Sequence, residues 1–195
     1  MNPDEYDYAA ARRAASELWL REQIAARLER LAARRPPVFA AKGDLNPQIA
    51  EWANRFISGQ PGGLIIVGNV GSGKTWSLWK LQETLIEAGF LGTMEICAAH
   101  ELRRLITPPV DEAALDRFAD ADIFAIDDIG SVRVSDWDAD HIMRLIDIRW
   151  PYQRPTILTS NKPDLRELLA ERVASRLSDG AMTVKILGTD RRRAQ

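Results

Sequence analysis

The chain of 195 residues contains a single cysteine, Cys97, and two histidines, His100 and His141. One cysteine excludes an internal disulfide and a zinc site built from cysteines, and it fits a reducing compartment. Neither histidine has a carboxylate or cysteine at metal-ligand spacing, so we interpret both as structural or solvent-exposed residues.

The sequence also lacks a strong net charge and a long hydrophobic run. Its formal charge is -2 at pH 7, so any binding to nucleic acid would depend on local basic patches. No apolar run approaches the length of a membrane span, and the beginning of the chain is acidic rather than signal-like. We therefore expect a cytoplasmic protein with no membrane partner.

The composition is that of a folded globular protein, with 46% hydrophobic and 28% charged residues. The length allows one α/β domain with a short appendage. We assign residues 1–36 to an N-terminal helical extension, which ends at a Pro-Pro pair, and residues 37–195 to the main domain. One stripe of the extension could lie against a partner helix or pack on its own domain, and it consists of Leu20, Ile24, Leu28 and Leu31.

The main domain opens with a predicted helix capped by Asn46, and short apolar runs then alternate with amphipathic stretches. The apolar runs predict strands at 64–67, 93–97, 122–126, 156–159 and 183–187. The amphipathic stretches predict helices at 76–88, 99–106, 111–118, 139–150 and 165–177. This alternation predicts an α/β fold, with a five-stranded parallel sheet covered by helices on both faces.

A complete G-x-x-x-x-G-K-[ST] pattern follows the first predicted strand and leads into a helix, which is the context of a phosphate-binding loop. The glycines let backbone N–H groups approach phosphates, Lys74 reaches the β and γ phosphates, and Thr75 offers its hydroxyl to Mg²⁺. The pattern predicts ATP and Mg²⁺ as cofactors; the alternative is a chance glycine-rich turn. Its residues are Gly68, Asn69, Val70, Gly71, Ser72, Gly73, Lys74 and Thr75.

Polar residues follow the third and fourth predicted strands. Asp127 and Asp128 end the third strand, where Asp127 would hold Mg²⁺ and Asp128 would orient or deprotonate the attacking water. Asn161 follows the fourth strand and could position that water against the γ phosphate. The alternatives are plain turn residues for the acids and an Asx turn for Asn161.

Two arginines, Arg172 and Arg176, lie four residues apart and share one face of a predicted helix. Either could act on the phosphates of a neighbouring subunit, where it would neutralise the charge that develops during phosphoryl transfer. The alternative is a surface arginine paired with Glu171 or Asp179.

Together, the segments GNVGSGKT, FAIDDIG, TILTSNKP and ERVASRL resemble the DnaC/DnaI branch of AAA+ ATPases, which includes bacterial and phage helicase loaders and the transposition helper IstB. The resemblance covers about residues 37–190. It implies that the fourth strand lies between the first and third, and that ATP binds between the subunits of a homo-oligomer. In this resemblance the Walker A motif is matched by Gly68, Gly73, Lys74 and Thr75, and the Walker B motif by Asp127 and Asp128. Sensor I is matched by Asn161. The arginine finger is matched by Arg176, and a second arginine of the family by Arg172.

Two features depart from the usual AAA+ pattern. Asp128 stands where Glu is usual and is one methylene shorter, so we expect slow turnover. The sequence after the fifth strand leaves no room for a helical lid, and loaders of this branch similarly resemble AAA+ proteins without a lid.

The resemblance implies an ATPase that loads the replicative helicase onto single-stranded DNA. The alternatives are an IstB-like transposition helper and a non-hydrolysing, ATP-dependent assembly adaptor. In the family the region of Arg103 and Arg104 faces single-stranded DNA, although a solvated helix face explains both residues as well. We expect the six tryptophans to be buried against the sheet, and the Arg191–Arg193 tail to be a solvated terminus.

Overall fold

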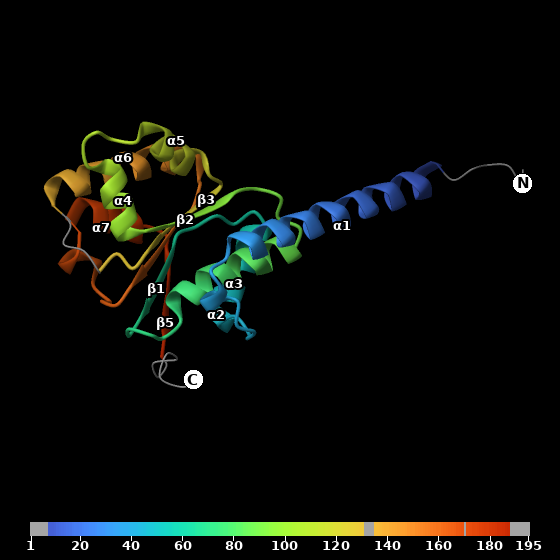
Figure 1. Ribbon diagram of the computed structural model, residues 1–195, viewed down its shortest axis with the longest axis horizontal. Helices are drawn as coiled ribbons and strands as arrows, with labels where there is room; N and C mark the ends of the chain where they lie inside the picture. Colours follow the sequence, from blue (N-terminus) through green and yellow to red (C-terminus); the bar gives the residue numbers. More distant parts are fainter. Residues whose placement is uncertain (1–7, 131–134, 170, 188–195) are drawn as a thin grey trace, which may run out of the picture.

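The computed structural model describes residues 8–130, 135–169 and 171–187, so the Arg191–Arg193 tail lies outside the described residues. Five strands form one parallel sheet in the order β2-β3-β4-β1-β5 (Figure 1). They are β1 Leu64–Gly68, β2 Met94–Ala98, β3 Ile123–Asp127, β4 Thr156–Ser160 and β5 Met182–Ile186. The predicted strands, their parallel pairing and the insertion of β4 between β1 and β3 are confirmed.

The helices follow the predicted alternation. They are α1 Tyr8–Arg34, α2 Pro47–Ile57, α3 Lys74–Glu87, α4 Ala99–Ile106, α5 Glu112–Asp120, α6 Asp136–Arg149 and α7 Glu171–Ser178, with 3-10 turns at Pro37–Phe39, Trp150–Tyr152 and Leu165–Glu167. Asn46 caps α2 as predicted, because its side chain accepts a hydrogen bond from the backbone N–H of Gln48.

One predicted helix, 165–177, is wrong over its first half. The side chain of Asp164 accepts a hydrogen bond from the backbone N–H of Arg166 and closes a local turn. The chain therefore begins this segment as a 3-10 turn, and α7 starts only at Glu171.

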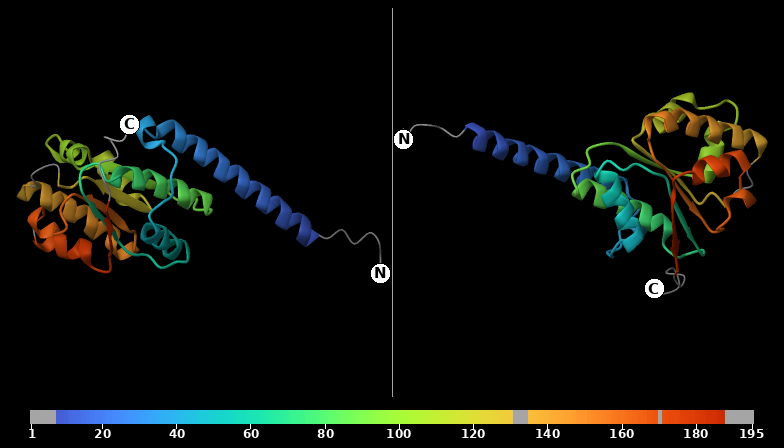
Figure 2. Two further views of the ribbon diagram at one scale, coloured as in Figure 1. Left: turned by 90° about the horizontal axis from the view of Figure 1, so that it is seen from below. Right: turned by 180° about the vertical axis from the view of Figure 1, so that it is seen from behind.

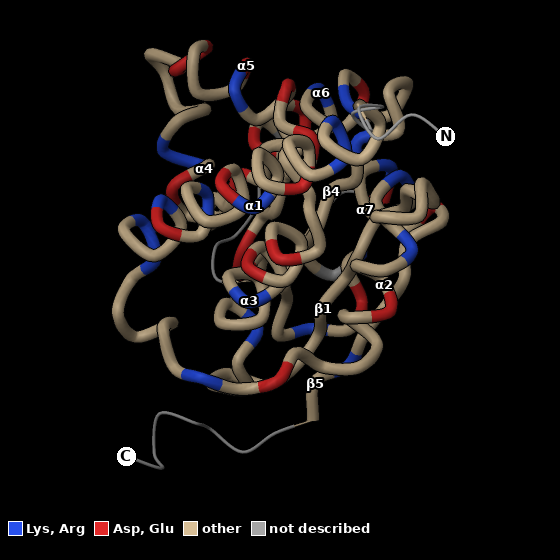
Figure 3. Tube along the Cα trace, turned by 90° about the vertical axis from the view of Figure 1, so that its right-hand side faces the viewer, with Lys and Arg blue, Asp and Glu red and all other residues tan. Residues whose placement is uncertain are grey.

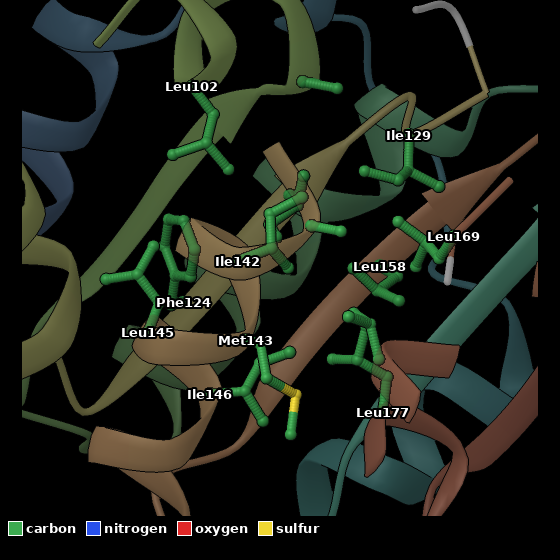
Figure 4. Close-up of a cluster of buried hydrophobic side chains, with 14 of the residues drawn as sticks. Leu102, Phe124, Ile129, Ile142, Met143, Leu145, Ile146, Leu158, Leu169 and Leu177 are labelled. Carbon is green, nitrogen blue, oxygen red and sulfur yellow. The ribbon is translucent and has the colours of Figure 1, made fainter. Parts of the chain in front are cut away.

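Helices cover both faces of the sheet (Figure 2), because successive side chains of each strand point to opposite faces. Ile65 and Val67 of β1 join the cluster formed with α4, α5, α6 and α7. Figure 4 shows part of this cluster, including Leu102 of α4, Leu145 of α6 and Leu177 of α7. Leu64 and Ile66 join a second cluster, formed with α2 and α3. This alternation places α3 and α7 on opposite faces of the sheet.

Helix α1 packs on the domain only at its C-terminal end, and its N-terminal part projects away from it (Figures 1 and 2). Leu31 is buried, and Arg35 forms an ion pair with Glu83 of α3 at 2.9 Å. In the projecting part, Leu18 is 60% exposed and Trp19 is 54% exposed. Of the apolar stripe, Leu31 therefore packs on its own domain at one end, whereas Leu20, 36% exposed, is open to solvent at the other.

The prediction that tryptophans are buried is correct for Trp52 and Trp76, whose relative exposures are 4% and 9%. It is wrong for Trp19, Trp137 and Trp150, which are about half exposed, at 54%, 49% and 55%. These three lie on the projecting helix or at the ends of α6.

A buried arginine that the sequence pattern did not single out joins three segments of the fold. Arg149, 1% exposed, donates hydrogen bonds to the backbone carbonyls of Phe118 (2.6 Å), Ala121 (2.6 Å) and Pro155 (2.8 Å). Burial lowers the pKa of Arg149 to about 10, so the guanidinium is charged at neutral pH. It therefore ties the end of α5 to the segments that lead into β3 and β4.

Lys and Arg are interspersed with Asp and Glu along the trace in the view of Figure 3. Among the residues that the structure describes, no helix has both the length and the apolarity of a membrane span.

Candidate nucleotide-binding site

The predicted phosphate-binding loop connects β1 to the first turn of α3, and its shape requires glycine. Gly71 and Gly73 have positive φ angles, of 77° and 97°, that other residues rarely adopt. A side chain at Gly68 would come within 2.6 Å of the Ser72 hydroxyl and 2.7 Å of the Ile186 carbonyl oxygen. The loop therefore packs tightly around the N-terminus of α3, where unpaired backbone N–H groups form a site for anions.

Lys74 lies inside this loop and is 8% exposed. Its ammonium group donates hydrogen bonds to the carbonyl oxygens of Gly68 (2.8 Å) and Asn69 (3.0 Å). The hydroxyl of Ser72 is buried and has no hydrogen-bond partner among the described residues. Thus a buried cation and an unsatisfied hydroxyl occupy a loop that is built for phosphate oxygens.

The carboxyl end of β3 meets the loop directly. The hydroxyl of Thr75 donates a 2.8 Å hydrogen bond to Oδ2 of Asp127. Asp127 is 8% exposed, and its other oxygen, Oδ1, accepts a 2.5 Å hydrogen bond from the hydroxyl of Thr159. The two predicted metal ligands, Thr75 and Asp127, are therefore in contact, although they are 52 residues apart in sequence.

Thr159 is a site residue that the sequence pattern did not single out. It is fully buried on β4, and its Oγ1 also accepts a 2.7 Å hydrogen bond from the backbone N–H of Asp128. The sequence contained a signal that could have identified Thr159, because the strand order implied by the family resemblance makes β3 and β4 neighbours, as the structure has them. Their register pairs Ile126 with Leu158, so the next residues, Asp127 and Thr159, lie side by side.

Asp128 and Asn161 lie at adjacent strand ends. Asp128 is half-buried and has a left-handed backbone, with φ 58°. Asn161 is exposed, and its side chain lies so close to Gly130 that a Cβ atom at Gly130 would overlap it. The structure therefore brings Asn161 to the turn that follows Asp128.

The alternative interpretation of Asn161, as the residue whose side chain closes an Asx turn before Lys162, is wrong, because the side chain of Ser160 closes this turn. The backbone N–H of Lys162 donates instead to the hydroxyl of Ser160, at 3.0 Å.

The two arginines of α7 pair with a residue that the sequence pattern did not predict. Arg172 and Arg176 lie 3.9 Å and 3.5 Å from the carboxylate of Asp147 on α6, rather than pairing with Glu171 or Asp179. The Arg176 guanidinium also lies 4.8 Å from the ring centroid of Trp150, a cation–π contact.

Both arginines line a cavity of about 650 Å³ whose described lining includes no residue of the phosphate-binding loop. Because α7 and α3 lie on opposite faces of the sheet, the structure does not bring Arg176 to Lys74 within one chain.

Each arginine of the basic pair on α4 forms an ion pair. Nε of Arg103 is 3.5 Å from Oδ2 of Asp138, and Nη2 of Arg104 is 3.7 Å from Oε1 of Glu101. The Arg104 side chain is 75% exposed. The Arg104–Glu101 pair is exposed on both sides and contributes little free energy, so the Arg104 guanidinium can exchange its carboxylate for another anion. Arg103 is half exposed, but its partner Asp138 is buried, with 7% of its side chain exposed.

The residues of the site fit ATP and Mg²⁺. The loop offers backbone N–H groups and a lysine to phosphates, without side chains that would block their approach. Thr75 and Asp127 present a hydroxyl and a carboxylate side by side, and hard oxygen donors of this kind suit Mg²⁺.

Neither models of protein families nor curated protein sequences match the chain, whereas solved structures do. DnaI is similar with a TM-score of 0.66 and 23% identity, over 81% of this chain and 94% of the DnaI chain. The DnaC helicase loader has a TM-score of 0.62 and 23% identity, over 76% of this chain and 96% of that one. AMPPCP-bound DnaA from Aquifex aeolicus has a TM-score of 0.62 and 17% identity, over 78% of this chain but 50% of DnaA. The chain therefore has an AAA+ fold of the DnaC/DnaI-like type.

Proposed function

We propose that the chain is an ATP-binding and ATP-hydrolysing DNA replication protein that loads a replicative helicase onto single-stranded DNA. The observation that carries this proposal is the contact between Thr75 and Asp127, which joins the phosphate-binding loop to the acidic end of β3 in a DnaC/DnaI-like fold. Such a contact is needed where one site must hold both the phosphates and their metal ion.

In this proposal the loop backbone binds the phosphates, and Lys74 exchanges the carbonyls of Gly68 and Asn69 for phosphate oxygens. Thr75 and Asp127 would hold Mg²⁺, which supplies positive charge against the phosphate oxygens. The Asp128 carboxylate accepts a proton or hydrogen bond from the attacking water, and the Asn161 amide orients that water. We expect slow turnover because Asp128 is shorter than the usual glutamate.

Arg176 would complete this site on a neighbouring copy of the chain. It lies on the face of the sheet opposite α3, and its Asp147 and Trp150 contacts involve partly exposed groups. A homo-oligomer with ATP between its subunits would place Arg176 against the neighbour's phosphates, with Arg172 as a second cation. This arrangement would make hydrolysis depend on assembly.

The helical extension, residues 1–36, would contact the helicase through the part of α1 that projects from the domain. Leu18 and Trp19 give that part an exposed apolar surface, which is the kind of surface that docks on a partner helix or groove. Arg103 and Arg104, whose side chains are 49% and 75% exposed, would contact the phosphates of single-stranded DNA.

Capture experiments test the partner. The full chain, loaded with ATP and Mg²⁺, should retain the replicative helicase of its source, and Lys74→Ala should retain less because it loses the nucleotide-dependent state. Retention of a transposase without the helicase would contradict the proposal and favour an IstB-like helper. ATP binding without phosphate release would favour a non-hydrolysing adaptor.

A further inference from the structure

The hydroxyl of Thr159 serves both acids at the end of β3. It donates to Oδ1 of Asp127 at 2.5 Å and accepts from the backbone N–H of Asp128 at 2.7 Å. Thr159 is fully buried, so water does not compete for either hydrogen bond. One buried group therefore links the predicted metal ligand to the predicted water-orienting residue.

We propose that Thr159 is a positioning residue of the nucleotide site, which fixes both the carboxylate of Asp127 and the backbone of Asp128. This inference rests on the proposed function, because it assigns Thr159 a role in the Mg²⁺-dependent chemistry of that site.

The carboxylate of Asp127 is held from both sides. Thr75 donates to Oδ2 and Thr159 to Oδ1, so the carboxylate cannot rotate without losing a hydrogen bond. Thr75 would serve as a Mg²⁺ ligand as well, so Thr159 would be the donor that keeps Asp127 in place. Groups that orient a metal ligand in this way commonly affect metal affinity by about 10-fold to 100-fold.

Thr159 also holds the backbone of Asp128 in place. A non-glycine residue in the left-handed region is unfavourable, and Asp128 has φ 58°. Its N–H donates to Oγ1 of Thr159, and the N–H of Ile129 donates to the carbonyl oxygen of Thr159 at 3.0 Å. Thr159 therefore supports the turn in which Asp128 takes this conformation.

The same contacts tie the ends of β3 and β4 together. Asn161 follows Thr159 by two residues, and its side chain lies against Gly130 in the turn that Thr159 supports. A change in the hydroxyl contact would thus displace Asp127, Asp128 and Asn161 relative to one another.

If Thr159 had only a structural role, any side chain that fills the space around residue 159 would serve, with or without a hydroxyl. Thr159→Val keeps the shape of the side chain and removes the hydroxyl, whereas Thr159→Ser keeps the hydroxyl and removes the methyl group. Thr156→Val is a matched control, because Thr156 lies on the same strand and its hydroxyl is 3.4 Å from Nε of Arg149, away from the site.

The test is a Mg²⁺ titration of the binding of a fluorescent ATP analogue to the full chain, started from a solution that contains EDTA. We expect Thr159→Val to bind the analogue like the parent in EDTA and to need about 10-fold more Mg²⁺ for half-maximal effect. Thr159→Ser should restore the parent titration, and Thr156→Val should not change it. Phosphate release should rank the variants in the same way as the Mg²⁺ titration. We expect a lower kcat in Thr159→Val, with little change in KM.

A parent-like Mg²⁺ titration of folded Thr159→Val would overturn the inference. If Thr159→Val does not fold, the comparison of Thr159→Ser with Thr159→Ala decides: a hydroxyl role predicts that only the serine variant titrates like the parent, and equal titrations overturn it. Failure of the parent itself to bind the analogue would overturn the proposed function and this inference together. A normal parent with an unaffected Thr159→Val would overturn this inference alone.

Discussion

The hydroxyl of Thr75 at the start of α3 donates a 2.8 Å hydrogen bond to Oδ2 of Asp127 at the end of β3. The contact joins the phosphate-binding loop to the acidic strand end through two oxygen donors, and Asp127 is almost completely buried there. A buried carboxylate next to a hydroxyl and a lysine-containing loop is suited to a metal–phosphate complex.

This relationship predicts the behaviour of Asp127→Asn. The amide keeps the size of the side chain but loses the charge that would hold Mg²⁺ in the proposed function. We therefore expect phosphate release to fall by about 100-fold or more, as for a lost charge at a phosphoryl-transfer site. Binding of a fluorescent ATP analogue in EDTA should stay close to that of the parent. Asp116→Asn, a substitution at an exposed residue of α5, is the control and should leave both measurements unchanged. Mg²⁺-dependent hydrolysis by Asp127→Asn at the parent rate would argue against a metal-binding role of Asp127.

Arg176→Ala tests whether the site is shared between subunits. Alone, this variant should bind ATP but release phosphate at least about 10-fold more slowly, because it loses the cation that would face the transferred phosphate in the proposed function. Mixed with Lys74→Ala, it should recover part of the activity, since one subunit supplies the loop and the other the arginine. Arg144→Ala, which removes an exposed arginine of α6, is the control. Mixtures of Arg176→Ala and Lys74→Ala that stay as inactive as the separate variants would contradict a site shared between subunits.

Trp19→Ala tests the projecting part of α1. Because Trp19 is 54% exposed, its loss should leave the thermal unfolding midpoint almost unchanged while it weakens retention of the helicase. Glu22→Ala, an exposed substitution on the same helix, is the control. Unchanged helicase retention by Trp19→Ala would remove Trp19 from the partner surface.

Arg149→Met should destabilise the fold without any direct contact with the nucleotide site. The substitution leaves the buried carbonyls of Phe118, Ala121 and Pro155 without their donor, at a cost of about 1–3 kcal/mol for each unsatisfied group. For a chain of this size, we expect the unfolding midpoint to fall by about 10 °C. A midpoint within about 2 °C of the parent value would show that water or a neighbouring group replaces the guanidinium.

Burial raises the pKa of the Cys97 thiol to about 12, with a further contribution from Glu101. The unfolded thiol has a pKa near 9.0, so this group contributes stability below pH 9 that is lost as the pH rises toward 12. Cys97→Ala should therefore lose less stability than the parent between pH 9 and 10.5, as measured by urea unfolding. A thiol reagent should react with native Cys97 at neutral pH only at the rate of unfolding, and rapid labelling of the folded protein would contradict the burial.

Most of the sheet could be predicted from the sequence because its physical signals are local. The run Leu64–Val67 is apolar at every position, as expected for a strand buried on both faces, and the glycine pattern that follows fixes the turn into α3. The side chain of Asn46 caps α2 within two residues, which a sequence pattern can indicate directly.

The parts that could not be predicted depend on contacts between distant segments. The resemblance placed β4 beside β3, but the register that sets Thr159 next to Asp127 comes only from the structure. Asp147 becomes the partner of Arg176 only when α6 and α7 pack together. The exposure of Trp19 depends on where α1 leaves the domain, and the helical pattern of α1 does not contain that information. The division at residue 36 and the roles of the site residues stay predictions.

Phosphate release by the full chain, measured with and without Mg²⁺ in the presence of single-stranded DNA, tests the ATPase site most directly. We predict slow release that requires Mg²⁺ and is lost in Lys74→Ala, because the loop and the Thr75–Asp127 pair then no longer act on the same phosphates. Release that continues in Lys74→Ala, or a parent that neither releases phosphate nor binds nucleotide, would contradict the presence of an ATP-hydrolysing site.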